Sequence, residues 1–238
     1  MKNWKTSNGT QIHQVLSGRS NAFLIATYDL NILVDTGYKF SFKKLLSNIS
    51  SLKLSNGKVD YLILTHTHFD HCHNAARIKN MFNCKIILSE NERIYAEKGF
   101  TPIPAGTGFF TRLLIYLGKR IDLKLFHYSP FRGDILITKD YELESMPFPV
   151  KIISTEGHSS GSISVIVDNE IAIVGDVMIG IFSDTVFPPF ADNVKQMVNS
   201  WKKLLDTGCK IFLSGHGSEI KRDFLQQDYE KYSKEIPK

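Results

Sequence analysis

Hydrophobic residues along the chain form short runs that end in turns containing Gly, Asp or Asn. Runs of this length that are rich in Val, Ile and Leu predict buried β-strands. The predicted strands span residues 21–27, 32–34, 61–65, 85–88, 151–154, 162–167, 171–174 and 211–214. The tripeptide Asp-Asn-Glu at residues 168–170 separates two of these runs, so we expect a β-hairpin there.

Four other segments carry apolar residues three and four positions apart, which is the spacing of one helix face. These predicted helices span residues 41–50, 74–81, 191–205 and about 222–233. In the third, one stripe consists of Val194, Met197, Val198, Trp201, Leu204 and Leu205. We expect this stripe to pack against the core. Because strands and helices occur together in both halves of the chain, the pattern predicts a layered α/β fold.

Residues 95–131 do not follow this alternation, because they combine many aromatic residues with Gly and Pro. They include the apolar stretch 109–117 and His127. A long connection of this kind is often a binding loop or a lid. We expect an insert that forms a pocket wall, a homodimer contact or part of the core, and periodicity alone does not choose among the three.

The chain has 238 residues, of which 42% are hydrophobic. This length and composition suit one large domain or two intimately packed halves with a sizeable core. We expect a single domain over residues 1–238, interrupted by the insert at about 95–131. The sequence contains no apolar run of membrane-spanning length.

The net charge of +5 and the pI of about 9.0 raise the question of a nucleic-acid partner. Lys and Arg are dispersed among Asp and Glu, without a basic run interleaved with aromatic residues. The distribution therefore favours a solvated surface over a nucleic-acid groove. We expect a small-molecule substrate and no nucleic-acid partner.

The three cysteines, Cys72, Cys84 and Cys209, have no CxxC spacing and leave one residue unpaired. This usage suits a reducing compartment and argues against a disulfide framework. The first five residues include no apolar leader segment. We therefore expect a cytoplasmic protein.

Candidate chemistry is concentrated in residues 65–71, Thr-His-Thr-His-Phe-Asp-His, directly after the apolar run 61–64. Neutral imidazole and carboxylate are ligands that zinc, iron and manganese accept. His66 and His68 are two residues apart and can point the same way from an extended backbone. Asp70 and His71 can then turn toward a second metal ion.

One loop supplies too few ligands for a metal site, and three further candidates each follow a predicted strand. They are His158, Asp176 and His216, and a glycine precedes each of them. Glycine permits the tight turn that exposes a side chain at the end of a strand. Five of the eight histidines belong to this candidate ligand set, whereas His13, His73 and His127 do not.

On these residues the chain resembles the metallo-β-lactamase superfamily of metallohydrolases. The matching residues, in the order of the family, are His66, His68, Asp70, His71, His158, Asp176 and His216. The segment 32–37, Ile-Leu-Val-Asp-Thr-Gly, also matches. The resemblance implies a four-layer αβ/βα sandwich of two mixed sheets with outer helices, and metal ions at one edge.

The resemblance also implies a role for each ligand. His66, His68 and His158 would hold one divalent ion, Asp70, His71 and His216 would hold the second, and Asp176 would bridge them. We expect zinc, with iron or manganese as alternatives. Asp35, which also follows a predicted strand, would orient a ligand histidine by accepting a hydrogen bond from its free N–H. Asp70 would be catalytic, exchanging a proton with a metal-bridging hydroxide.

Three functions are compatible with this site. The leading hypothesis is a dinuclear hydrolase of a small-molecule ester, thioester or lactone. The alternatives are a phosphodiesterase or nuclease of the same fold, and a mononuclear iron enzyme resembling the persulfide dioxygenases. An aspartate at position 176 resembles the glyoxalase II and lactonase branch, although Ile179 stands where quorum-quenching lactonases carry Tyr.

Two features depart from the glyoxalase II pattern or from the usual motif. About twenty residues follow His216, so we expect no glutathione-binding helical domain there. His73 replaces a glycine that usually follows the motif. We expect His73 to start or cap the helix 74–81, although it could also add an imidazole to the pocket, and we expect Cys72 to be a packing residue.

Overall fold

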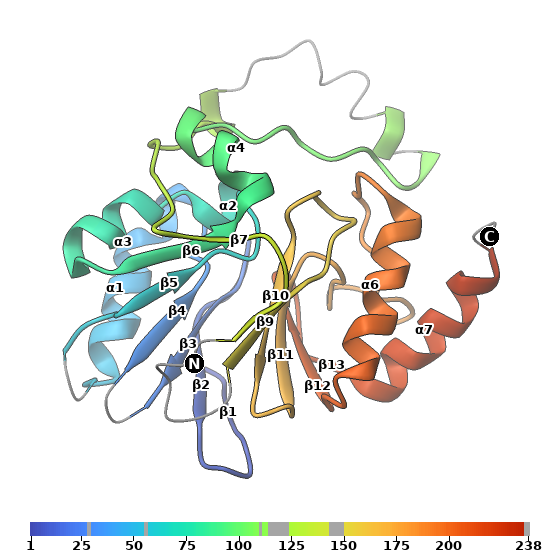
Figure 1. The fold of residues 1–238 in the computed structure, drawn as a ribbon, viewed down its shortest axis with the longest axis horizontal. Coiled ribbons are helices and arrows are strands. Elements are labelled where there is room, and N and C mark those ends of the chain that lie inside the picture. Colours follow the sequence, from blue (N-terminus) through green and yellow to red (C-terminus); the bar gives the residue numbers. More distant parts are fainter. Residues whose placement is uncertain (28–29, 55–56, 110, 114–123, 143–149, 236–238) are drawn as a thin grey trace.

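The computed structural model describes residues 1–27, 30–54, 57–109, 111–113, 124–142 and 150–235, and two β-sheets face each other at its centre (Figure 1). The first sheet has the strand order β1 (Asn3–Lys5), β2 (Gln11–Leu16), β3 (Ala22–Ala26), β4 (Asn31–Val34), β5 (Tyr61–Ile63), β6 (Lys85–Ser89) and β7 (Ile135–Ile137). Neighbours from β1 to β4 are antiparallel, and those from β4 to β7 are parallel.

The second sheet is also mixed. Its strand order is β13 (Ile220–Lys221), β12 (Ile211–Ser214), β11 (Ile171–Gly175), β10 (Ile163–Val167), β9 (Val150–Ser154) and β8 (Tyr141–Glu142). Strands β11 and β12 are parallel and the other described neighbours are antiparallel. The predicted hairpin joins β10 to β11, and its turn residues Asp168 and Asn169 both have a left-handed φ of 54°.

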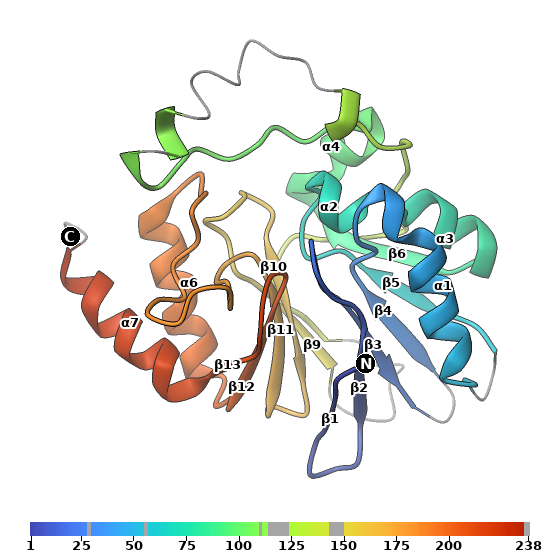
Figure 2. The same cartoon turned by 180° about the vertical axis from the view of Figure 1, so that it is seen from behind.

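Helices cover the outer face of each sheet, as both views show (Figures 1 and 2). The first sheet carries α1 (Phe42–Ser51) and α3 (Ala75–Phe82), and the second carries α6 (Val194–Asp206) and α7 (Arg222–Glu235). The short helices lie in the connections: η1 (Lys39–Ser41), α2 (Phe69–Cys72), η2 (Glu90–Glu92), α4 (Arg93–Lys98) and η3 (Lys124–Phe126). The expected four-layer sandwich of two mixed sheets is confirmed.

Alternation along the strands divides the core into three layers. In β4, Ile32 and Val34 point between the sheets, whereas Leu33 points toward α1. In β11, Ile173 points between the sheets and Val174 points toward α6. Each fully buried aliphatic side chain contributes about 1.5–3 kcal/mol relative to an exposed one, so both faces of each sheet stabilise the sandwich. The stripe predicted on α6 lies in the core layer between the second sheet and the helices α6 and α7, with Val194 partly buried.

The predicted elements are present with small shifts at their ends, and five of the strands in the described part of the chain were not predicted. Strand β2 has a bulge between Gln14 and Leu16, which breaks the apolar–polar alternation. Strands β1, β7, β8 and β13 have only two or three residues each, which is too short to show a clear apolar pattern in the sequence. The predicted start of α6 at 191 was wrong, because the Asn193 side chain caps the helix by accepting a hydrogen bond from the Gln196 N–H.

The described parts of the insert 95–131 run across the edge of the sandwich at which α2 and α4 lie (Figures 1 and 2). Tyr128 and Phe131 are buried, whereas Phe109 and Leu113 are 77% and 45% exposed. The rest of the predicted apolar stretch, residues 110 and 114–117, lies outside the described residues. The insert therefore joins the core at its end and exposes apolar side chains near its middle.

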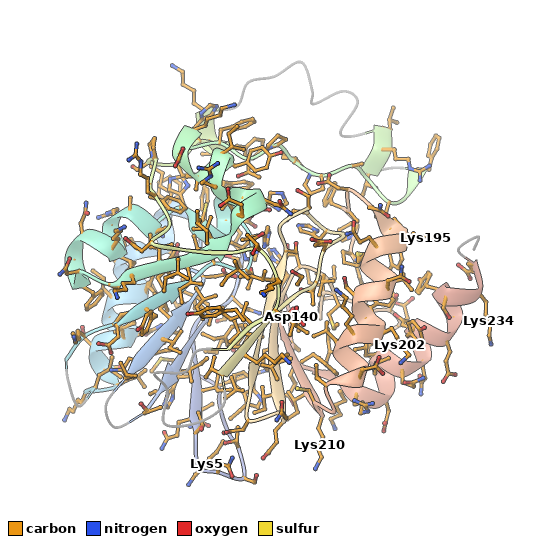
Figure 3. All side chains as sticks on the ribbon, viewed as in Figure 1. Lys5, Asp140, Lys195, Lys202, Lys210 and Lys234 are labelled. Atoms are coloured by element: carbon orange, nitrogen blue, oxygen red, sulfur yellow. The ribbon has the colours of Figure 1, made fainter. Side chains whose placement is uncertain are left out.

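Several lysines are exposed at the surface. Figure 3 labels Lys5 on β1, Lys195 and Lys202 on α6 and Lys234 on α7. Among the residues that the structure describes, no helix is both long enough and apolar enough to cross a membrane.

Candidate metal centre

All seven candidate ligands lie at one edge of the sandwich. His66 and His68 follow β5, with Asp70 and His71 in the adjoining helix α2. His158 follows β9, Asp176 follows β11 and His216 follows β12. Strands β9, β11 and β12 run in the same direction, so their carboxyl ends meet at one edge of the second sheet. The fold thus brings together ligands that are up to 150 positions apart in the sequence.

Three histidines form the first group, which we name the histidine triad: His66, His68 and His158. One ring nitrogen from each lies within 4.8 Å of the others. His158 Nε2 lies 3.0 Å from His68 Nδ1. All three residues are buried, so their nitrogen atoms face one another rather than solvent.

Asp70, His71 and His216 form the second group, which we name the mixed triad. Their ligand atoms also lie within 4.8 Å of one another. His216 Nε2 lies 3.3 Å from His71 Nε2 and 3.5 Å from Asp70 Oδ2. Asp70 and His216 are only partly buried, so this side of the centre is the more open one.

The Asp176 carboxylate lies between the two triads. Its Oδ1 is 3.3 Å from His71 Nε2, and its Oδ2 is 3.1 Å from His216 Nε2 and 3.8 Å from His158 Nε2. One carboxylate therefore approaches histidines of both groups. This is the position that the sequence resemblance implies for a shared ligand.

Hydrogen-bond partners outside the centre assign the tautomers of three rings. Because carboxylate and carbonyl oxygens only accept, His71 Nδ1–H donates to Asp35 Oδ2 at 2.8 Å, and His158 Nδ1–H donates to the Phe190 carbonyl at 2.9 Å. The Thr65 hydroxyl donates to Asp35, so its oxygen accepts from His66 Nδ1–H at 3.1 Å. Each of these rings then directs Nε2 into the centre.

The pKa shifts of the histidines follow the same division into two triads. Burial, reinforced by neighbouring imidazoles, holds the pKa of His66 and of His68 well below its usual range. Burial also lowers the pKa of His158. Burial acts in the same direction on His71, but the Asp176 and Asp35 carboxylates outweigh it and raise the pKa of His71 well above its ordinary value.

Asp176 dominates the potential on the mixed-triad side. Burial opposes protonation of His216, but Asp176 outweighs it and raises the pKa of that ring. In turn, burial alone would raise the pKa of Asp176, whereas His216 and His71 hold it well below its usual range. The histidine triad therefore favours neutral imidazoles and Asp176 favours the ionised carboxylate, which are the forms that ligate a metal ion. His71 and His216 favour the protonated form, so a metal ion that binds them would displace their protons.

The ligand residues fit divalent metal ions. His66 Nε2 and Asp176 Oδ1 are buried atoms without a hydrogen-bond partner. Such atoms are costly to bury unless something satisfies them. When the histidines are neutral, the atoms nearest to them in the centre are other acceptors, which cannot donate a hydrogen bond. A bound cation would satisfy both His66 Nε2 and Asp176 Oδ1. Imidazole nitrogen and carboxylate oxygen are the donors that zinc and related ions prefer.

The glycines before the ligands act in two different ways. Gly157 and Gly175 have left-handed φ values of 132° and 56°, in agreement with the predicted tight turns. Gly215 has no such φ. A Cβ there would lie 2.2 Å from Asp176 Oδ1 and 2.5 Å from His71 Cε1. At this position glycine is needed because the backbone passes directly over two candidate ligands.

The histidines left out of the ligand set have other surroundings. His73 lies between α2 and Asn74, the N-cap residue of α3, and forms a T-shaped contact with Tyr38 at 5.6 Å. His127 is exposed and stacks on Phe100 at 4.8 Å. Cys72 is fully buried and donates to the Thr67 carbonyl at 3.1 Å, which agrees with a packing role.

Sequence reasoning missed Glu92. This carboxylate is fully buried and accepts hydrogen bonds from Thr67 and Ser159, which are neighbours of the ligand histidines. It lies in Ser-Glu-Asn-Glu at residues 89–92, a segment that has the composition of an ordinary solvated turn. No local signal distinguishes Glu92 from Glu90, because only the tertiary fold buries one of the two.

Comparisons with known proteins agree with this geometry. Residues 17–216 match the family model of the metallo-beta-lactamase superfamily. A probable metallo-hydrolase of Methanocaldococcus jannaschii is 29% identical over 159 residues, which are 67% of this chain and 67% of that protein. A Dictyostelium discoideum protein named glyoxylase B2 is 27% identical over 134 residues, which are 55% of this chain but 39% of that protein.

Solved structures show the same architecture. A Cronobacter sakazakii metallo-beta-lactamase has a TM-score of 0.71 and 16% identity, covering 99% of this chain and 94% of that one. An archaeal superfamily protein from Sulfolobus tokodaii has a TM-score of 0.64 and 19% identity, covering 92% and 85%. At such identities the likeness concerns the fold alone.

Proposed function

This chain belongs to the metallo-β-lactamase superfamily, and from this premise we propose that it is a dinuclear metal-dependent hydrolase of a small-molecule ester, thioester or lactone. The observation that carries the proposal is the position of Asp176 between two triads, with one oxygen 3.1 Å from His216 Nε2 and 3.8 Å from His158 Nε2. A carboxylate so placed can bind two ions at once.

Each group of residues has a separate task in this proposal. The histidine triad and the mixed triad would each hold one divalent ion, with Asp176 shared and Asp35 orienting His71. Ions bound there would polarise the scissile carbonyl and lower the pKa of a water molecule from 15.7 toward about 7. Asp70 is half-buried at the open side of the centre, so its carboxylate can accept a proton and pass it on. We propose zinc first, with iron and manganese as alternatives.

The insert supports a substrate with an apolar part. The Thr101 hydroxyl donates to the Thr67 carbonyl at 2.6 Å, so the insert is attached to the ligand loop. Phe126 packs on Phe69 at 4.7 Å, and Phe69 stands between His68 and Asp70 in the sequence. The insert therefore also contacts α2, the helix that carries Asp70 and His71. The relative named as a glyoxylase lends further support to an acyl substrate.

Metal content is the first test. Protein reconstituted with excess zinc, iron or manganese and then desalted should retain two ions per chain, measured by elemental analysis. A reproducible content of one ion or none would reject the dinuclear proposal. One retained iron ion would favour the alternative that resembles the persulfide dioxygenases.

The second test identifies the bond. The metal-loaded protein is assayed on chromogenic carboxyl esters, thioesters, lactones and phosphodiesters, with His158→Ala as the ligand-deficient control. We expect turnover of an acyl substrate that His158→Ala lacks. Turnover confined to phosphodiesters would replace the proposal by the phosphodiesterase alternative.

An acyl-length series then tests the insert. Each buried methylene is worth about 0.8 kcal/mol, so kcat/KM should rise severalfold per methylene until the pocket is full. Provided that esterase activity is present, a flat response would leave the insert as a core or homodimer element.

A further inference from the structure

Glu92, the last residue of η2, is a fully buried carboxylate beside the candidate metal centre. Among the described residues no basic side chain forms an ion pair with it. An ionised carboxylate in such a place must be satisfied by hydrogen bonds, since burial without partners is costly. The partners of Glu92 therefore show what the side chain does.

The two carboxylate oxygens of Glu92 reach two different loops. Oε2 accepts from the Thr67 backbone N–H at 3.1 Å and from the Thr67 hydroxyl. Oε1 accepts from the Ser159 hydroxyl at 2.6 Å. Thr67 stands between His66 and His68, and Ser159 directly follows His158. All three members of the histidine triad thus neighbour a residue that Glu92 holds.

The surrounding hydroxyl groups are arranged so that each can donate in one consistent direction. The Ser162 hydroxyl lies 3.0 Å from that of Ser159 and can donate to it, which frees the Ser159 proton for Glu92. The Thr101 hydroxyl donates to the Thr67 carbonyl at 2.6 Å, and the Thr67 hydroxyl donates to Glu92. Three donors therefore point at Glu92, which suits a carboxylate and not a protonated acid.

The two loops belong to opposite halves of the sandwich. Thr67 follows β5 of the first sheet, and Ser159 follows β9 of the second. The Glu92 side chain fits between the two loops because residue 161 is glycine. A Cβ at Gly161 would lie 2.5 Å from Glu92 Cγ. The neighbouring Asn91 adds a parallel link, because its side-chain amide donates to the Ser160 carbonyl at 2.9 Å.

We propose that Glu92 is a positioning residue that aligns the two loops of the histidine triad, and so sets the affinity of the ion that this triad binds. The inference rests on the proposed function in one respect, since it requires metal at the histidine triad. Glu92 bonds to no residue of the mixed triad, so its effect is specific to one of the two ions.

The informative variant is Glu92→Gln, which keeps the shape but replaces one acceptor oxygen by an amide that donates. Either the Thr67 N–H or the Ser159 hydroxyl then loses its acceptor. Outer partners of metal ligands typically account for about 10–100-fold in metal affinity. We expect a loss in this range for the first ion and little change for the second. Glu92→Asp should show a similar loss, because the shorter side chain cannot reach both loops.

Asp168→Asn is the matched control. Asp168 is also a buried carboxylate that accepts from two hydroxyls and one N–H group, but its partners Thr6, Thr10 and Asn8 lie at the opposite end of the sandwich. This variant should lower the melting temperature and leave both zinc affinities unchanged. It separates a specific effect on the ligands from a general loss of stability.

The experiment is a titration of metal-free protein with zinc against a chromophoric chelator, without substrate. His158→Ala and His216→Ala identify which binding step belongs to which triad. The wild type should show two steps, and Glu92→Gln should weaken the step that His158→Ala abolishes. Should Glu92→Gln not fold, Ser159→Ala takes its place, with a severalfold weakening of the same step.

The outcomes are distinguishable. A wild type that binds no zinc at the histidine triad overturns the proposed function and this inference with it. A normal wild type with unchanged steps in Glu92→Gln, or in Ser159→Ala where that replaces it, overturns only the inference. Equal weakening of both steps, or the same change in Asp168→Asn, also overturns it, because the role would then be structural.

Discussion

Asp35 and Asp168 are two buried aspartates at opposite ends of the same sandwich, and they share an uncommon backbone conformation. Their φ values are 60° and 54°, in the left-handed region, and their exposed fractions are 2% and 8%. Asp is one of the few residues that tolerate this conformation. Both follow a central strand, β4 for Asp35 and β10 for Asp168.

The two aspartates differ in what they bind. Asp168 accepts from the Thr6 and Thr10 hydroxyls at 2.6 and 2.7 Å and from the Asn8 amide, so it ties the β1–β2 turn to the β10–β11 hairpin. Asp35 accepts from Thr65 and from His71 Nδ1–H, and the other nitrogen of that ring faces the candidate centre. A buried aspartate with a left-handed backbone therefore links two turns at one end of the sandwich, and at the other end it orients the His71 ring.

The comparison shows at which end of the sandwich buried polar atoms lack hydrogen-bond partners. At the Asp168 end, the carboxylate accepts from three neutral donors, the Thr6 and Thr10 hydroxyls and the Asn8 amide. At the Asp35 end, imidazoles and carboxylates converge with buried atoms that lack partners. Such an arrangement is unfavourable for folding without a cation and is typical of a functional site. Five predictions test this division between a binding end and a structural end.

The largest effect is expected from Asp176→Ala. This change removes the carboxylate that approaches both triads, so hydrolysis should fall to background and at least one ion should be lost. Activity assays and elemental analysis measure the two effects. Asp176→Cys keeps a ligating atom and should retain more metal. Wild-type rate and metal content in Asp176→Ala would show that Asp176 is not a ligand.

Asp35→Asn should have the next largest effect. Asn tolerates the left-handed backbone but presents an amide that cannot accept in the same way from both Thr65 and His71. We expect a loss of about 10–100-fold in metal affinity or rate, with the fold retained. Circular dichroism and zinc titration test both parts. An equal loss in Asp168→Asn would remove the distinction between the two ends.

Addition of metal should stabilise the binding end. An ion that binds only the folded state adds about 2.7 kcal/mol to the free energy of unfolding at 100 times its Kd. Thermal unfolding with zinc and with a chelator should therefore differ by several degrees for the wild type. The increment should persist in Asp168→Asn and shrink in Asp35→Asn. A wild-type melting temperature that does not respond to zinc would contradict metal binding.

Asp168→Asn should reduce stability without touching the centre. Loss of acceptor capacity at a buried site costs about 1–3 kcal/mol, which corresponds to about 2–4 °C per kcal/mol for a chain of this size. The melting temperature of the metal-free protein measures it. An unchanged melting temperature would mean that the link between the β1–β2 turn and the hairpin adds nothing to the fold.

The smallest effect concerns Asp134, at the start of β7 and away from the centre. Partial burial raises its pKa, but hydrogen bonds from Lys79 and the Ile86 N–H outweigh this and hold the pKa below its ordinary value. Its contribution is therefore present above the ordinary pKa and lost as the pH falls through the lowered one. The Lys79–Asp134 pair is about one-third exposed, so solvent limits the effect to less than about 1 kcal/mol.

Urea unfolding of wild type and Asp134→Asn between pH 6 and pH 2.5 would measure this last effect. The two proteins should differ slightly at the upper end and converge at the lower end. A difference that grows as the pH falls would contradict the assigned direction.

The sequence by itself determined the layered architecture and the residues that meet at its edge. Apolar runs predicted the central strands, because a buried strand needs apolar side chains on both faces regardless of its neighbours. The ligand candidates were recognisable because metal chemistry restricts them to a few residue types, and four of them lie in one loop of six positions, from His66 to His71.

Only the tertiary structure decided how these residues are supported. The pairing of β7 with β6, the partner of His158 at the Phe190 carbonyl and the burial of Glu92 all depend on segments that are not adjacent in the sequence. Glycine at 215 looked like a turn residue, yet it is needed because Asp176 and His71 pass close to it. Local patterns record which face of an element is apolar. They do not record which distant hydrogen-bond donor a buried carboxylate will meet, because that depends on how the two sheets pack.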